Sequence, residues 1–248
     1  MTQTPVVRLH LYFARNAPLA VIVRQGPTRQ YRMILWDRSD DTFTDGQWLR
    51  KNLYPERCAI SPDGRHFLYF MLDGQWGSDA EGAYTVISRP PYWTAVALFP
   101  EGSTWGGGGV FLDDRHYLAA GDADIIGRDD GLVRLHWGDT GQGCTTGLRR
   151  PDNSPAPLDK TTVARLLSGD LPADHRDLGR RLWDRADRPL DRYDTQGGCL
   201  YRRAGGEMEL IRDFTRMTFE PIRAPYDWRD ETGREPDRPW HPLDGDDG

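Results

Sequence analysis

The stretch at residues 60–70 constrains this chain most, because it joins a tight-turn signal to an uninterrupted apolar run. Pro62 fixes its own φ angle, Asp63 can accept a hydrogen bond from nearby backbone, and Gly64 tolerates a positive φ. Residues 67–70 are all apolar, which is typical of a strand covered on both faces. The stretch therefore predicts a turn that leads directly into a buried β-strand.

The same pattern returns 50 residues later, since Asp63 to Phe70 aligns with Asp113 to Ala120. Both copies carry an Arg-His pair directly before the apolar residues. A repeat of this length is typical of a repeated all-β unit of propeller-blade size. We therefore predict an all-β fold, in a propeller-like arrangement of about four or five blades.

Apolar and β-branched runs between turn residues predict the strands of these blades. The first blade is expected at residues 6–14, 19–24, 31–37 and 42–48. The second is expected at residues 58–61, 66–72, 83–88 and 94–99. The third is expected at residues 109–112, 116–120, 132–137 and 144–148. Further strands are expected at residues 199–203, 208–214 and 215–219.

A short helical insertion is expected at about residues 158–187, where apolar side chains recur at helical spacing. Its two expected helices cover residues 160–168 and 173–186. Long insertions on a repeat scaffold commonly carry function. We therefore predict a binding surface on the second helix, formed by Arg180, Leu182 and Trp183.

The C-terminal segment 221–248 is rich in proline and acidic residues. Such a composition buries too little apolar surface to offset the entropy of ordering it. The sequence thus predicts one β domain over residues 1–220 and a flexible acidic tail over 221–248. An aromatic residue within 225–228 remains a candidate for docking on the domain.

Composition and charge argue against a nucleic-acid binder. The formal net charge is −6, and all but two of the 32 basic residues are arginine. Arginine suits phosphate or carboxylate recognition, but these arginines are dispersed along an acidic chain. An arginine-based nucleic-acid binder is therefore only the third hypothesis. Three widely spaced cysteines, no signal-peptide pattern and no apolar run of about 18 residues predict a cytoplasmic protein with reduced thiols.

The Ser61-Pro62-Asp63-Gly64-Arg65 turn with its aromatic strand resembles the repeats of WD-like β-propellers, especially the Tol-associated type. The resemblance covers residues 58–72 and, more loosely, 108–121, where Asp113-Asp114 replaces Pro-Asp-Gly. The whole chain also resembles a group of uncharacterised bacterial proteins, which implies no activity. The propeller resemblance implies a fold and mostly scaffold or recognition roles, and a fold does not fix a function.

A candidate metal site lies in the loop at residues 122–131, with Asp122, Asp124 and Asp129 as its carboxylates. A glycine occupies position 6 of this loop, as in calcium loops, but Ile126 and Val133 stand where ligands are needed. The alternatives are a metal held by converging acidic loops and a solvated acidic hairpin. The sequence favours the hairpin.

His66 and His116 occupy equivalent positions of the repeat, so they form either a paired binding site or repeated structural hydrogen bonds. The glycine run at residues 106–109 lacks the Gly-Lys-Ser/Thr of a phosphate loop and predicts either a close backbone approach or a turn between blades. Nine tryptophans could provide a stacking platform, but most lie at strand ends, where blades pack together. Cys144 is the most plausible reactive thiol, near His136.

The leading functional hypothesis is a non-enzymatic protein-recognition or scaffold module that binds another protein and requires no cofactor. The first alternative is a metal-dependent hydrolase or lactonase-type propeller. No complete catalytic motif supports the alternative, because the Ser103 region lacks the glycine of a nucleophile elbow.

Overall fold

The computed structural model describes residues 7–128, 130–137, 148–154, 156, 158–166 and 192–227. Over these residues the fold is all-β, as predicted, and its sheets are mainly antiparallel. In the described part of the chain two short helices accompany the strands, the 3₁₀ helix η1 (Pro55–Arg57) and the helix α1 (Lys160–Leu166). No helix in the described part of the chain is long and apolar enough to span a membrane.

The first sheet confirms the four strands predicted at residues 6–14, 19–24, 31–37 and 42–48. Its strands pair in chain order as β1 (Arg8–Phe13), β2 (Leu19–Gln25), β3 (Tyr31–Asp37) and β4 (Thr42–Leu49). Side chains of a strand alternate between the two sides of the sheet. The central strands are buried on both faces, because a separate apolar core packs against each side. Ile22 opposes Ile34 on one face, whereas Val21 opposes Leu35 on the other.

The second sheet confirms the four strands predicted for the second blade. It contains β5 (Asn52–Leu53), β6 (Ala59–Ile60), β7 (Phe67–Leu72), β8 (Ala83–Ser88) and β9 (Ala95–Pro100). The two-residue strand β5 was not predicted, because so short a strand leaves no periodic pattern. The apolar run at residues 67–70 forms most of β7 and is buried on both sides, as expected.

The third sheet departs from the prediction. It contains β10 (Gly109–Phe111), β11 (His116–Ala119) and β12 (Val133–Arg134), and β12 runs parallel to β11. The single strand expected at residues 132–137 is therefore wrong: the chain divides into β12 and β13 (His136–Trp137). The latter pairs with β14 (Leu148–Arg149). Leu135, between the two short strands, is buried.

The C-terminal sheet contains β15 (Tyr193–Gln196), β16 (Cys199–Ala204) and β17 (Glu207–Asp213). Strands β16 and β17 were predicted, and β15 was not. The strand predicted at residues 215–219 is wrong, because the chain turns after β17. The side chain of Asp213 accepts a hydrogen bond from the amide of Thr215 (2.7 Å), and buried Arg24 donates to the carbonyl of Phe214 (2.7 Å).

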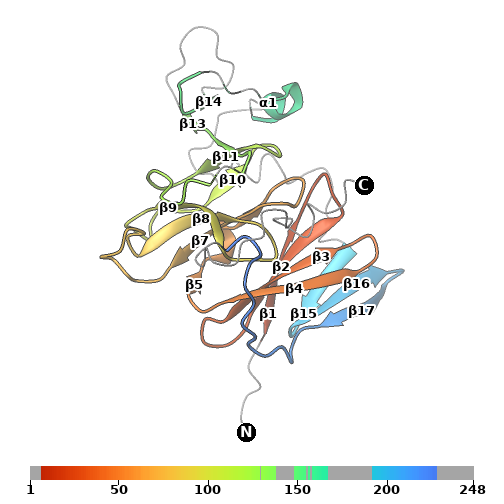
Figure 1. Cartoon of the computed structure of the whole chain (residues 1–248). Helices are drawn as coiled ribbons and strands as arrows, with labels where there is room; N and C mark the ends of the chain where they lie inside the picture. Colours follow the sequence, from red (N-terminus) through yellow and green to blue (C-terminus); the bar gives the residue numbers. More distant parts are fainter. Residues whose placement is uncertain are drawn as a thin grey trace.

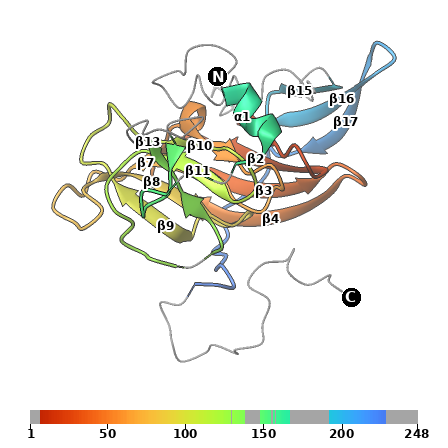
Figure 2. The same cartoon turned by 90° about the horizontal axis from the view of Figure 1, so that it is seen from above.

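The sheets pack face to face in a row. Figures 1 and 2 place the C-terminal sheet beside the first sheet and the β13–β14 pair beside the third. A separate apolar core fills each junction along the row. From the C-terminal sheet onward, these cores include Trp36 and Leu200, then Val21 and Tyr69, then Leu68 and Phe111, and finally Leu118 and Leu148. The two ends of the row lie apart in Figure 1.

The predicted insertion and tail are described only in part. Helix α1 confirms the first expected helix, and Asp159 caps it by accepting hydrogen bonds from the amides of Thr161 and Thr162. In the predicted tail, Tyr226 is 5% exposed and packs on the second and third sheets, so an aromatic does dock there. The second expected helix and the tail beyond residue 227 lie outside the described residues.

Candidate functional site

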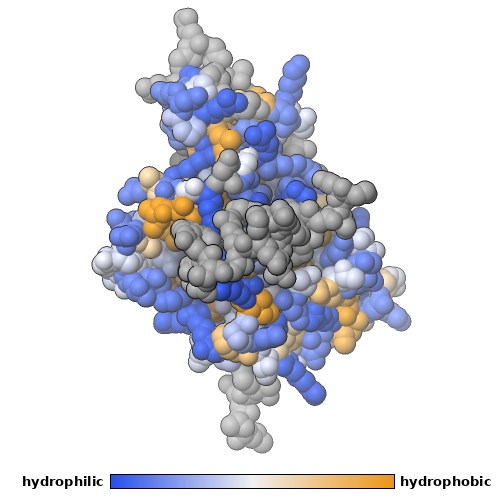
Figure 3. All heavy atoms as spheres, viewed as in Figure 1, coloured by the Kyte–Doolittle hydropathy of each residue, from blue (hydrophilic) through white to orange (hydrophobic). Residues whose placement is uncertain are grey.

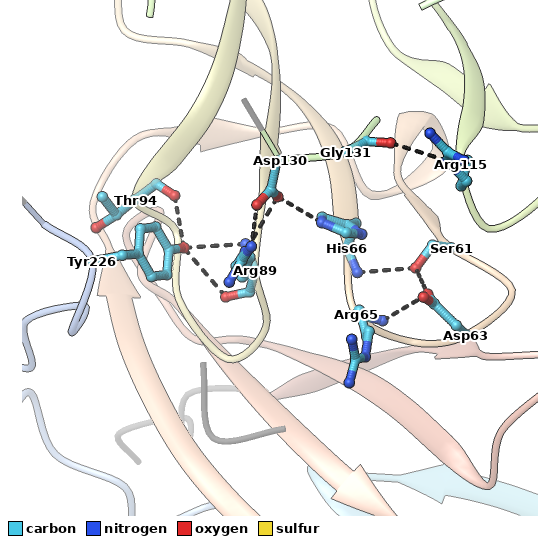
Figure 4. A network of polar contacts seen from close by, with 10 residues as sticks. All are labelled: Ser61, Asp63, Arg65, His66, Arg89, Thr94, Arg115, Asp130, Gly131 and Tyr226. Carbon is cyan, nitrogen blue, oxygen red and sulfur yellow. Dashed lines mark hydrogen bonds and ion pairs between the residues drawn. The ribbon is translucent and has the colours of Figure 1, made fainter. Parts of the chain in front are cut away.

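The two ends of the second sheet carry different chemistry. At one end, where β7 begins and β8 finishes, polar side chains are buried together (Figure 4). At the other end, the β7–β8 and β9–β10 connections leave the sheet. The register places these connections at the same end, since Leu72 opposes Ala83 and Tyr84 opposes Pro100.

The buried polar end is a clasp formed by His66, Arg89, Asp130 and Tyr226 (Figure 4). His66 Nε2 lies 2.6 Å from Asp130 Oδ2, and Arg89 forms an ion pair with the same carboxylate. The hydroxyl of Tyr226 accepts a hydrogen bond from the amide of Arg89 (3.1 Å) and donates to the carbonyl of Thr94 (2.9 Å). The clasp therefore joins the second sheet, the third sheet and the C-terminal segment.

The turn at residues 61–66 positions His66 next to the clasp without using its imidazole ring. Gly64 adopts φ +80° and donates to the carbonyl of Ser61, which closes the turn. The Ser61 hydroxyl accepts a hydrogen bond from the amide of His66 (2.9 Å), and Asp63 accepts one from the amide of Arg65 (3.0 Å). Because the turn satisfies its own backbone, the imidazole ring of His66 is left to bind a carboxylate distant in sequence.

The electrostatics of the clasp favour an ionised Asp130. Burial alone would raise the pKa of Asp130, but hydrogen bonds from His66 and Arg89 outweigh it and lower the pKa to about 2. An ionised carboxylate only accepts hydrogen bonds, so Nε2 of His66 carries a proton. The side chains of His66 and Asp130 are 9% and 4% exposed. The pair is therefore nearly closed to solvent and connects the start of β7 to the loop before β12.

His116 sits in the second copy of the turn and has a different partner. Its Nδ1 contacts both carboxylate oxygens of Asp113, at 2.8 and 2.9 Å. Asp113 also accepts from the amides of Arg115 and His116, at 2.8 and 2.7 Å. The two histidines therefore bind separate carboxylates, which agrees with structural hydrogen bonds in each copy. Among the described residues, no interaction joins the two histidines in a paired site.

The residues of the candidate metal loop are engaged in different ways. Asp124 accepts hydrogen bonds from the amides of Leu98 (2.9 Å), Ile126 (2.9 Å) and Gly127 (3.1 Å), so it holds this loop against the edge of β9. The side chain of Asp122 is exposed, and Asp129 lies outside the described residues. Within the described ranges, no three His, Cys, Asp or Glu side chains are placed to hold a metal ion.

The opposite end of the second sheet exposes two tryptophans. We call this surface the Trp rim: Trp76, Trp105 and the loops 73–82 and 101–108 that carry them. Trp105 is 93% exposed and Trp76 is 55% exposed. The sequence predicted that most tryptophans lie at strand ends and pack in the core or on the rim of the propeller. Trp36 and Trp93 are buried, whereas Trp76 and Trp105 are exposed. Figure 3 shows one face of the molecule, which is mostly hydrophilic with hydrophobic groups between. Among the described residues, the large hydrophobic side chains that are exposed are those of Trp76, Trp105, Ile125, Met208, Leu210 and Phe219.

The backbone of the loop that carries Trp105 makes several contacts with the second sheet, whereas the Trp105 side chain is exposed. Arg57 donates hydrogen bonds to the carbonyls of Thr104 (3.0 Å) and Gly106. The amide of Gly108 donates to the hydroxyl of Thr85 (2.8 Å). Gly107 adopts φ +91°, and a Cβ there would lie 2.1 Å from the ring of Phe70. This confirms the predicted close backbone approach.

The two rim loops also touch each other. A Cβ on Gly102 would lie 2.8 Å from the carboxylate of Glu81, and Trp76 covers Gly82. The amide of Glu101 donates to the carbonyl of Ala83 (2.9 Å), where both loops leave the sheet. The loops are thus a joint surface rather than two independent tips.

The remaining predicted site residues are not described. Arg180, Leu182 and Trp183 of the second expected helix, and Cys144, lie outside the described residues, and their roles stay predictions. The rim itself could have been anticipated in part, because glycine-flanked tryptophans in loops have few apolar neighbours in sequence to pack on.

Comparisons with protein families, with curated proteins and with solved structures find no match to this chain. A functional assignment therefore has to come from the geometry of the molecule.

Proposed function

We propose that this chain is a non-enzymatic, propeller-like recognition module that binds another protein through the Trp rim. The propeller-like arrangement is supported by the order of the sheets. Successive sheets pack face to face in chain order, and the C-terminal sheet returns to cover the first. Repeats that cover each other in this way leave loops and strand edges for binding.

The observation that carries the proposal is the combination of a fixed loop and a free side chain at Trp105. The loop is held by Arg57, by Thr85 and by contact with Phe70, yet the indole contributes almost nothing to the fold. Covering the indole with another surface would remove its apolar area from water, which is favourable. Tryptophan is also among the residues that dominate binding energy at protein interfaces.

A fixed loop strengthens this interpretation. Binding is weakened when interface residues must first be ordered, so a preorganised loop gains affinity. In the Trp rim, the backbone of the loop is held by hydrogen bonds and packing, while the side chain of Trp105 is exposed to solvent. The metal-dependent hydrolase has no such supporting geometry in the described part of the chain.

The test is site-specific photo-crosslinking in the native host, with the crosslinker at position 105 in one strain and at position 210 in another. Leu210 is the matched control, because it is 53% exposed and lies on β17 in the C-terminal sheet. We expect one protein to be crosslinked through position 105 and not through position 210. That protein, once purified, should bind Trp105→Ala at least about thirtyfold more weakly than wild type, since tryptophan hot spots contribute roughly 2 kcal/mol or more. Equal affinity for wild type, Trp105→Ala and Trp76→Ala would refute the proposal.

A further inference from the structure

The charged groups of the Trp rim are of one sign. The rim loops contain the four acidic residues Asp73, Asp79, Glu81 and Glu101 and no lysine or arginine. Asp73 is used locally, because it accepts hydrogen bonds from the amide of Gln75 (2.8 Å) and the hydroxyl of Tyr84 (3.1 Å). The other three carboxylates border the two tryptophans without such a pair of internal bonds.

Burial raises the pKa of Glu101, and Arg57 and Arg134 carry the guanidinium groups that act on Glu101 to lower it, but within the described residues neither group is ion-paired with it. Arg57 is bound to the carbonyls of Thr104 and Gly106 beneath the rim. Arg134 donates to the carbonyls of Ala119 (2.7 Å) and Gly121 (2.6 Å). Neither arginine forms an ion pair with a carboxylate in the portion of the chain that is described. The rim therefore keeps its negative charge.

The surroundings of the individual carboxylates also favour a negatively charged rim. Asp79 and Glu81 are exposed, and within the described residues neither takes part in an ion pair. Glu101 is half-buried, and burial raises its pKa, so a positive charge brought to this carboxylate would be favourable. Its hydroxyl neighbour Thr85 lies at 3.4 Å, which is a weak interaction.

From this arrangement we infer that the partner presents an arginine- or lysine-bearing segment to the Trp rim. The inference rests on the proposed function. The face of an indole attracts a guanidinium or an ammonium group, and carboxylates beside it add a second attraction of the same sign. The surface is built from two exposed loops that touch, so it suits an extended protein segment. An acidic partner would be repelled by Asp79, Glu81 and Glu101.

The experiment uses three fluorescent dodecapeptides of one design: Arg at every third position with Gly and Ser between, the same peptide with Gln for Arg, and the same with Glu for Arg. Binding to the full chain is measured by fluorescence anisotropy. We expect the Arg peptide to bind and the other two to bind at least about tenfold more weakly. Trp105→Ala should weaken binding of the Arg peptide at least about tenfold.

A matched pair of variants separates local recognition from general attraction to an acidic protein. Asp79→Asn/Glu81→Gln removes two negative charges from the rim, and Glu207→Gln/Glu209→Gln removes two exposed charges from β17. We expect the rim variant to lose about tenfold in affinity for the Arg peptide and the β17 variant to lose less than about twofold. Equal losses in both variants, or no measurable binding of the Arg peptide, would overturn the inference.

The protein captured through position 105 distinguishes this inference from the proposed function. If its affinity falls with Trp105→Ala but not with Asp79→Asn/Glu81→Gln, the cationic segment is wrong and the recognition surface stands. If its affinity falls with neither, both are wrong. A fall with both variants supports both.

Discussion

The two ends of the second sheet place polar and aromatic groups in opposite environments. At the clasp, His66, Arg89 and Asp130 are charged or polar and nearly closed to solvent. At the Trp rim, Trp76 and Trp105 are aromatic and open to it. Globular proteins usually place these residue types the other way round. The buried charges therefore require compensating interactions inside the molecule. The exposed indoles would gain free energy if another surface covered them.

The clasp has its compensation within the chain. The carboxylate of Asp130 receives hydrogen bonds from two side chains, and Tyr226 satisfies the backbone of Arg89. Comparable compensation for Trp105 is absent from the described residues, although its loop is fixed in place. The charged groups of the clasp are thus paired within the chain, whereas the indole of Trp105 stays exposed, which is why we propose that a partner covers it. Substitutions at the two ends should therefore have separable effects on stability and on binding.

The largest effect is expected from removing the centre of the clasp. Asp130→Ala leaves Arg89 and His66 without their shared carboxylate, and breaking a buried ion pair costs about 3–5 kcal/mol. For a chain of this size the melting temperature should fall by roughly 10 °C, measured by calorimetry. Asp122→Ala removes an exposed carboxylate from the same loop and should change the stability by less than about 0.5 kcal/mol. If the two variants melt at the same temperature, the clasp does not hold the sheets together.

The next effect concerns the loop beneath the rim. Gly107→Ala introduces a Cβ against the Phe70 ring in a backbone with φ +91°. Overpacking and the left-handed backbone together should destabilise the protein by about 2–4 kcal/mol in urea unfolding. Gly205→Ala is the control, because Gly205 has φ +60° and open space around it. It should lose only about 1 kcal/mol. A similar loss for both variants would mean that the rim loop is not fixed by its contact with Phe70.

A smaller effect is expected from pH. The pKa of Asp130 falls from 3.8 to about 2 on folding, so ionised Asp130 stabilises the folded state. This contribution, about 2 kcal/mol, is fully present above about pH 5 and is lost as the pH falls from about 4 toward 2. Urea unfolding between pH 6 and pH 2.5 should show a steeper acid loss for wild type than for Asp130→Asn. Parallel pH profiles for the two proteins would contradict the assignment.

The sequence predicted the parts of this molecule that depend on local chemistry. Pro62, Asp63 and Gly64 indicated a turn, and the apolar run after them indicated a buried strand. The all-β class and the strands of the first two sheets came from the same kind of signal. Each of these features is set within about ten neighbouring residues, so one sequence contains the necessary information.

Features that depend on the path of the chain were missed. The partner of His66 lies 64 residues away in Asp130, which the sequence placed in a solvated hairpin. The parallel pairing of β12 with β11 involves a two-residue strand, Val133–Arg134, that carries no periodic pattern. The polar strand β15 (Tyr-Asp-Thr-Gln) has no apolar alternation to mark it. The exposure of Trp105 was missed because burial is decided by what the fold brings near a residue, and the fold brings little near this one.

The division of roles between clasp and rim is tested by measuring unfolding free energy and partner affinity on the same preparations of Trp105→Ala and Asp130→Ala. The partner is the protein captured through position 105, and the measurements are made at a temperature where both variants are folded. We expect Trp105→Ala to keep its unfolding free energy within about 0.5 kcal/mol and to lose at least about 2 kcal/mol of binding. Asp130→Ala should do the opposite, losing stability and keeping affinity. A destabilised Trp105→Ala that still binds at wild-type affinity would contradict this division.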